Sequence, residues 1–128
     1  MIERQIRLIW KNYPDCEIFV VVGFDSDKIK KHLKKYPVRF IENPIHEKTN
    51  VLYSIGMGIQ ATITDKVLIV YGDLVFNEHA IKGIVNRESK VVVDLNGHMD
   101  KREVGVVCES NEIKNFSFGL EKKWSQIA

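Results

Sequence analysis

The sequence predicts an α/β fold, a three-layer domain with a mostly parallel sheet and a small antiparallel hairpin annex. Segments with helical periodicity alternate with short apolar runs along most of the chain. Two runs, residues 18–22 and 67–71, are apolar without a break, which is typical of strands buried on both faces of a parallel sheet. Near the carboxyl end, a turn-like tetrad at residues 109–112 indicates a hairpin.

The first part of the chain predicts a helix, a strand, a second helix and a second strand. Apolar residues at spacings of three and four predict an amphipathic helix over residues 2–13, ended by the proline that follows. The apolar run at residues 18–22 is the first strand. Candidate N-caps at residues 25–27 precede a helix over residues 28–35. Residues 38–40 alternate more weakly and suit a sheet edge.

The rest of the chain continues the alternation. Its predicted elements are a helix over residues 52–63, a buried strand within residues 66–76, a helix over residues 77–85, a strand over residues 91–95 and a hairpin of residues 104–108 and 113–118. No internal repeat or low-complexity segment interrupts this order. We therefore expect one domain, residues 1–128.

Composition excludes several classes of protein. The chain is 45% hydrophobic and 28% charged, as in ordinary globular domains. The net charge of +2 is too small to indicate a nucleic-acid partner. Cys16 and Cys108 are far apart and lack metal-site spacing, so a reduced, cytoplasmic protein is expected. The sequence shows neither a signal peptide nor an apolar run long enough for a membrane span.

The segment KVLIVYGDLVF, residues 66–76, carries the strongest candidate for a functional residue. Ligands of open α/β sheets bind beyond the carboxyl ends of the strands, where Gly72 would turn the backbone and Asp73 would face the crevice. A carboxylate placed there suits a divalent metal that phosphates also hold. The alternative is that Asp73 only caps the turn.

A second segment, residues 39–59, places polar side chains at the same edge of the predicted sheet. Asn43 follows one strand, and Thr49 and Asn50 begin a helix, so the two segments are expected to converge. A helix N-terminus near Asn50 offers free amides to an anion or a nucleobase carbonyl. Glycines at positions 56 and 58 fit either close packing of this helix or a ligand.

Other motifs favour structural interpretations. Five lysines in KIKKHLKK follow aspartates, as the helix dipole prefers, and indicate a solvated helix face. The four histidines lack the spacing of metal ligands. The sequence contains neither a dinucleotide-binding glycine motif after a strand nor a Walker loop.

The ordered set VVVGF, FIENP, TN, YSI, LIVYGDLVF and VVVD resembles the sugar-phosphate and phosphocholine nucleotidyltransferases, over about residues 2–117. The resemblance implies a glycosyltransferase-A-like, nucleotide-diphospho-sugar transferase-like fold. It implies that Asp73 binds Mg²⁺ between nucleotide phosphates and that Thr49, Asn50 and Ser54 lie at the nucleotide pocket. Asn43 and Gly72 complete the candidate nucleotide-binding set. Asp94 is a candidate substrate residue, and no catalytic residue is assigned.

The chemistry implied is attack by a phosphate ester on the α-phosphorus of a nucleoside triphosphate, CTP or UTP, with pyrophosphate leaving. The acceptor would be a phosphorylated sugar or a phosphocholine-type compound. The alternative is a non-catalytic nucleotide-binding or assembly module with the same fold.

The resemblance also implies a truncated domain, because family members begin with a strand and a glycine-rich loop that this sequence does not show. That strand would lie between the runs at residues 18–22 and 67–71. Its removal leaves two apolar edges, which either close on each other or are covered by another chain. We expect self-association as a dimer and little catalysis by this chain alone.

Overall fold

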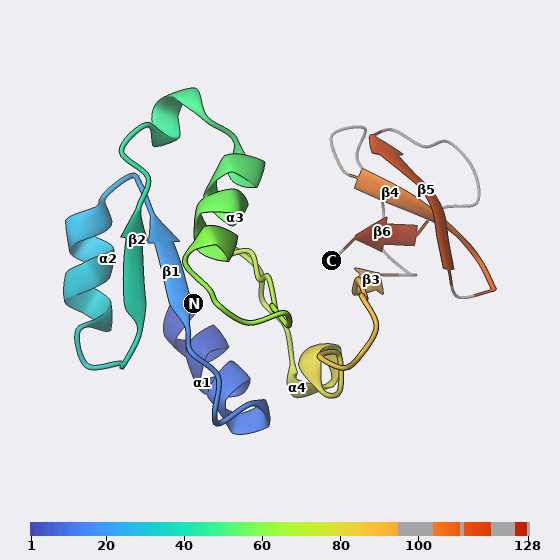
Figure 1. Cartoon of the computed structure of the whole chain (residues 1–128), viewed down its shortest axis with the longest axis horizontal. Coiled ribbons are helices and arrows are strands. Elements are labelled where there is room, and N and C mark those ends of the chain that lie inside the picture. Colours follow the sequence, from blue (N-terminus) through green and yellow to red (C-terminus); the bar gives the residue numbers. More distant parts are fainter. Residues whose placement is uncertain (95–103, 111, 119–124, 128) are drawn as a thin grey trace. The chain divides into compact units, whose positions relative to one another are not determined.

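The computed structural model describes residues 1–94, 104–110, 112–118 and 125–127 (Figure 1). These residues form two compact units, Met1–Asn86 and Arg87–Ala128, and each is described by itself. The first unit is mixed α/β and the second is an antiparallel sheet. In the part of the chain that the structure describes, every helix is too short or too polar to cross a membrane.

The first unit follows the predicted alternation of helices and strands (Figure 1). Its sheet has two parallel strands, in register from Phe19 opposite Arg39 to Val22 opposite Glu42. In chain order the elements are α1 (Ile2–Asn12), β1 (Phe19–Val22), α2 (Ser26–Leu33), β2 (Arg39–Glu42), the 3₁₀ helix η1 (His46–Lys48), α3 (Val51–Gln60) and α4 (Glu78–Ile81).

Local sequence signals explain most of these elements. The apolar stripe of α1 buries Ile6, and α2 buries Leu33 completely. Helix α3 is capped at its amino end by Asn50, whose side-chain oxygen accepts a hydrogen bond from the Tyr53 amide at 3.2 Å. A Cβ built at Gly58 would lie 3.5 Å from Val21 of β1, an ordinary van der Waals contact, so the packing of α3 on the sheet does not require glycine at this position.

The predicted buried strand at residues 66–76 is wrong for this structure. Residues 66–71 pair with no strand among the described residues. Val67, Ile69 and Tyr71 keep 45%, 50% and 40% of their surface exposed, although their composition is that of a core strand. The physical reason is that a cavity lies between this segment and β1, so the backbone of residues 66–71 has no neighbour with which to form a ladder.

The helix predicted over residues 77–85 is shorter than expected. Asn77 caps α4 by accepting hydrogen bonds from the amides of His79 and Ala80. The helix ends at Ile81, and Gly83 follows with a φ of 71°, in the left-handed region that favours glycine. Residues 82–85 therefore do not extend α4, although their apolar residues have helical spacing.

The second unit contains a four-stranded antiparallel sheet in the order β3-β6-β4-β5. Strands β4 (Val104–Glu109) and β5 (Glu112–Phe118) form the predicted hairpin, with Ser110 in the left-handed conformation at its turn. Strand β3 (Val93–Asp94) pairs antiparallel with β6 (Ser125–Ile127). A strand was predicted over residues 91–95, and the structure has one at Val93–Asp94; Leu95 lies outside the described residues.

Substitution of Gly23 tests the close packing of the end of β1 against His46 of η1. A Cβ at this position would lie 2.6 Å from the Cβ of His46 and 2.7 Å from its Cγ, so η1 would have to move. We expect Gly23→Ala to lower the free energy of unfolding by about 1–3 kcal/mol, the usual cost of overpacking. Urea denaturation measures the change.

The matched control is Gly56→Ala, because a Cβ at Gly56 in α3 meets no atom within 4 Å. Removing a glycine from a helix interior should raise the free energy of unfolding by about 0.5–1 kcal/mol. Equal destabilisation by both substitutions would contradict the proposed contact with His46.

Candidate functional site

Asn43 organises the polar cluster that follows β2. Its side chain is 2% exposed, and its amide nitrogen donates to Thr49 Oγ1 at 3.0 Å and to Ser54 Oγ at 3.2 Å. Its side-chain oxygen accepts from the Ile45 amide at 3.1 Å. Both amide protons are therefore used inside the protein, and Asn43 orients Thr49 and Ser54.

The start of α3 presents the remaining predicted residues of this segment. Asn50 is exposed, and its side-chain oxygen caps the helix while its side-chain nitrogen makes no hydrogen bond with the described residues. Thr49 donates its hydroxyl to the Ile45 carbonyl at 3.1 Å. The first turn of this ten-residue helix therefore combines free backbone amides with fixed hydroxyl groups, an arrangement suited to anions.

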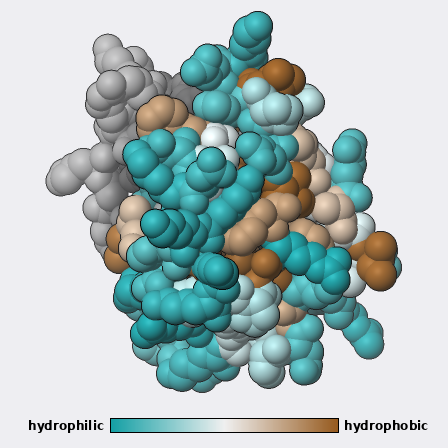
Figure 2. Space-filling model, turned by 90° about the vertical axis from the view of Figure 1, so that its left-hand side faces the viewer, coloured by the Kyte–Doolittle hydropathy of each residue, from teal (hydrophilic) through white to brown (hydrophobic). Residues whose placement is uncertain are grey.

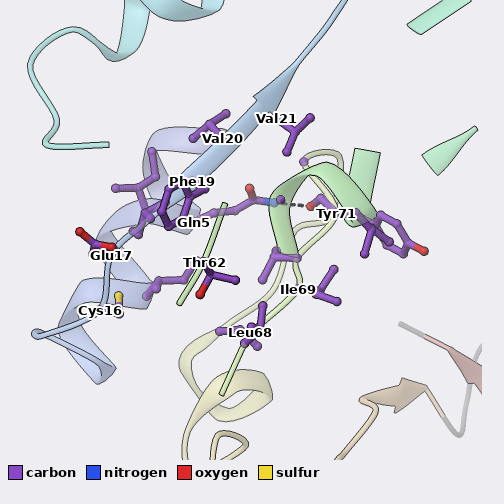
Figure 3. Close-up of a pocket in the computed structure, with 18 of the residues that line it drawn as sticks. Gln5, Cys16, Glu17, Phe19, Val20, Val21, Thr62, Leu68, Ile69 and Tyr71 are labelled. Carbon is purple, nitrogen blue, oxygen red and sulfur yellow. Dashed lines mark hydrogen bonds between the residues drawn. The ribbon is translucent and has the colours of Figure 1, made fainter. Parts of the chain in front are cut away.

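The Gly72–Asp73 turn is held by side chains of α1. Gln5 is 5% exposed, and its amide nitrogen donates to the Tyr71 carbonyl at 3.0 Å and the Leu74 carbonyl at 2.6 Å, on either side of the turn. Figure 3 shows the Gln5 side chain reaching toward Tyr71. These two partly buried hydrogen bonds fix the backbone that carries Asp73.

Asp73 itself is exposed and makes no hydrogen bond or ion pair with any part of the chain that the structure describes. A carboxylate that only capped its turn would accept a hydrogen bond from a nearby backbone amide. The arrangement therefore leaves both carboxylate oxygens available to a ligand.

A cavity of about 1100 Å³ lies within the first unit. Its walls are α1, β1, the inner face of α3 and residues 66–72, and they are mainly apolar (Figure 3). Ser54 and Gly72 both line it, whereas Asn43, Thr49, Asn50 and Asp73 are not among its lining residues. Asp73 follows Gly72 directly. Asp94 belongs to β3 of the second unit and is therefore not placed relative to these residues.

The donor set fits a metal held jointly with a substrate. Within the described ranges no group of three or more His, Cys, Asp or Glu side chains could hold a metal by itself. Mg²⁺ usually takes one or two carboxylates and completes its shell with phosphates and water. The unpaired Asp73 carboxylate matches that requirement.

Some other ionisable groups of the unit have structural partners or an environment that explains their charge state. Hydrogen bonds from Lys30 and Ser26 hold the pKa of Glu42, at the end of β2, below its usual range. Burial raises the pKa of the Cys16 thiol in the cavity wall, which disfavours a thiolate nucleophile there. Lys28 of α2 pairs with Asp25 at 2.7 Å. The face that Figure 2 shows is mostly hydrophilic, as expected for a solvated lysine helix.

Sequence reasoning missed two of these roles. Gln5 lies beside the apolar stripe of α1. A polar residue next to such a stripe is a weak signal that its side chain makes hydrogen bonds to buried backbone groups. Asn43 was predicted to contact a nucleotide. In the structure it is buried and donates hydrogen bonds to two hydroxyl groups, which its position after a strand did not indicate.

Comparison with known proteins agrees with the predicted resemblance. Residues 1–114 match the MobA-like NTP transferase domain, whose chemistry is nucleotidyl transfer from a nucleoside triphosphate. No curated protein and no solved structure matches the chain. The match covers both candidate segments and most of the chain, and it confirms the resemblance to nucleotidyltransferases. The chain therefore belongs to the MobA-like NTP transferase family.

Proposed function

We propose that the first unit binds a nucleoside triphosphate, CTP or UTP, together with Mg²⁺, for nucleotidyl transfer to a phosphorylated sugar or phosphocholine-type acceptor. The observation that carries the proposal is that the Asp73 carboxylate makes no hydrogen bond or ion pair with the described residues, while Gly72 beside it and Ser54 of α3 line one cavity.

Each residue has a distinct role in this proposal. The amides that begin α3 and the hydroxyls of Thr49 and Ser54 bind phosphate or base oxygens, and Asn43 holds both hydroxyls in place. Asp73 would hold the metal, which when bound offsets the negative charge that develops on the phosphates. Gln5 fixes the turn and is a positioning residue.

The transfer exchanges one bond to phosphorus for another. An oxygen of the acceptor phosphate forms a bond to the α-phosphorus, and the bond from that phosphorus to the oxygen bridging to the β-phosphate breaks. The electron pair leaves with pyrophosphate. Oriented donors that stabilise the charge on the phosphates are the chain's contribution.

A non-catalytic nucleotide-binding or assembly module is the second candidate. It is favoured by the donor set, since no group of three or more His, Cys, Asp or Glu side chains among the described residues could hold a metal by itself. Pyrophosphate release separates the candidates. Release that depends on both nucleotide and acceptor supports transfer, whereas nucleotide binding without release supports the module.

Asp73→Asn tests the metal site. The substitution removes the negative charge but keeps the size of the side chain, so we expect the Mg²⁺-dependent affinity for CTP or UTP to fall at least about tenfold. Isothermal titration calorimetry with and without Mg²⁺ measures it. Asp27→Asn is the control, because Asp27 is an exposed aspartate of α2 outside the site. Unchanged Mg²⁺-dependent affinity in Asp73→Asn would refute the metal role.

Gln5→Leu tests the positioning of the turn. The leucine fills similar space but leaves the Tyr71 and Leu74 carbonyls without their donor, so the free energy of unfolding should fall by about 1–3 kcal/mol. Nucleotide affinity, measured where the variant is fully folded, should fall as well. Gln60→Leu, at an exposed position of α3, is the control and should change neither quantity. Loss of stability with full affinity would show that Gln5 has no influence on the site.

A further inference from the structure

Phe24 is an exposed aromatic residue in the turn of residues 23–26, which follows β1. It keeps 76% of its surface exposed, although only Gly23 separates it from the apolar strand. A single exposed apolar side chain is common on protein surfaces and needs no explanation by itself. The backbone on either side of Phe24, however, is built in a way that an ordinary surface turn does not require.

Both neighbours of Phe24 are held in special positions. Asp25 has a φ of 53°, in the left-handed region that is uncommon for a residue other than glycine. Gly23 lies so close to His46 of η1 that a Cβ there would be 2.6 Å from the His46 Cβ. A strained backbone that its surroundings maintain is typical of ligand-binding positions, so the turn is a candidate for such a role.

The turn lies at the end of the unit where the candidate residues of the start of α3 gather. Figure 1 shows the arrowheads of β1 and β2 directed toward the same end, where η1 and the start of α3 also lie. The contact of Gly23 with His46 joins the turn to η1. Thr49 ends η1, and Asn50 caps α3. One packing contact and a three-residue helix therefore connect the turn of Phe24 to the candidate site.

The residues around the start of α3 suit the faces and the edge of a nucleobase. Ile45, Leu52 and Tyr53 keep 44%, 67% and 47% of their surface exposed. The side-chain nitrogen of Asn50 makes no hydrogen bond with the described residues. A nucleobase has flat faces that stack on aromatic rings and polar edges that accept hydrogen bonds from amides. Phosphate groups have no such face, so the exposed apolar side chains favour the base over the triphosphate here.

We infer that Phe24 is a base-binding residue of the proposed nucleotide site, with its ring stacked on the face of the pyrimidine. The inference rests on the proposed function and adds to it a place for the base, at the start of α3, apart from the phosphates that share the metal with Asp73. In this arrangement the Asn50 side-chain nitrogen donates to the O2 carbonyl that cytosine and uracil share. Stacking tolerates either pyrimidine, so Phe24 contributes affinity without distinguishing CTP from UTP.

The test compares CTP with inorganic tripolyphosphate, each with Mg²⁺, by isothermal titration calorimetry of the full chain. Phe24→Ala should weaken CTP binding at least about fivefold, the usual effect of removing a stacked aromatic ring, and leave tripolyphosphate binding unchanged. Phe24→Tyr keeps the ring and should keep the CTP affinity, whereas Phe24→Leu is apolar without a ring and should lose it. Phe116→Ala is the matched control, because Phe116 is 67% exposed in β5 of the second unit.

A second measurement locates the base directly. The indole introduced by Phe24→Trp should lose fluorescence when CTP binds but not when tripolyphosphate binds, and the indole introduced by Phe116→Trp should respond to neither. Equal CTP affinity of Phe24→Ala and the unsubstituted chain would overturn the inference and leave the proposed function standing. Absence of Mg²⁺-dependent CTP binding by the unsubstituted chain would overturn both.

Discussion

The constraint on which the first unit depends is that the backbone of residues 67–71 has no strand to pair with among the described residues. Apolar side chains favour burial of this segment, but each buried amide and carbonyl without a partner costs free energy. With no strand beside it in the described chain, the segment stays half exposed. The Gln5 side chain satisfies two carbonyls at its end and thereby fixes the place where Asp73 stands.

A similar use of one buried amide side chain organises the loop between β2 and α3. The backbone N–H of Asn43 continues the hydrogen-bond pattern of the sheet by donating to the Val22 carbonyl at 2.8 Å. Its side chain then links the end of β2 to Thr49 and Ser54. Gln5 and Asn43 thus do comparable work, because each converts a loop after an apolar segment into a fixed turn without requiring a further strand.

Local patterns predicted the elements whose stability is local. The helices α1, α2 and α3, strand β1 and the hairpin of β4 and β5 follow from periodicity, caps and turn residues. Periodicity reports which side chains favour burial, but it carries no information about which strand is present to pair. Residues 66–71 were therefore misassigned, and the antiparallel pairing of β3 with β6 was not predicted. The candidate site residues were predicted from their residue types at the ends of predicted strands. The hydrogen bonds that Gln5 donates to the Tyr71 and Leu74 carbonyls could not be predicted in this way, because they depend on tertiary packing.

The cavity and the candidate nucleotide site share the turn at Gly72. Residues 67–71 end where this turn begins, and Ser54 of the opposite wall lines the same space. Ordering of residues 67–71 would also order the backbone that leads directly into Asp73, and the proposed nucleotide would order the same backbone from the other side. Events that each restrict one segment lower the entropic cost for the other. Because such coupling is reciprocal, ordering of residues 67–71 that tightens nucleotide binding by some factor must itself become more favourable by that factor when nucleotide is bound.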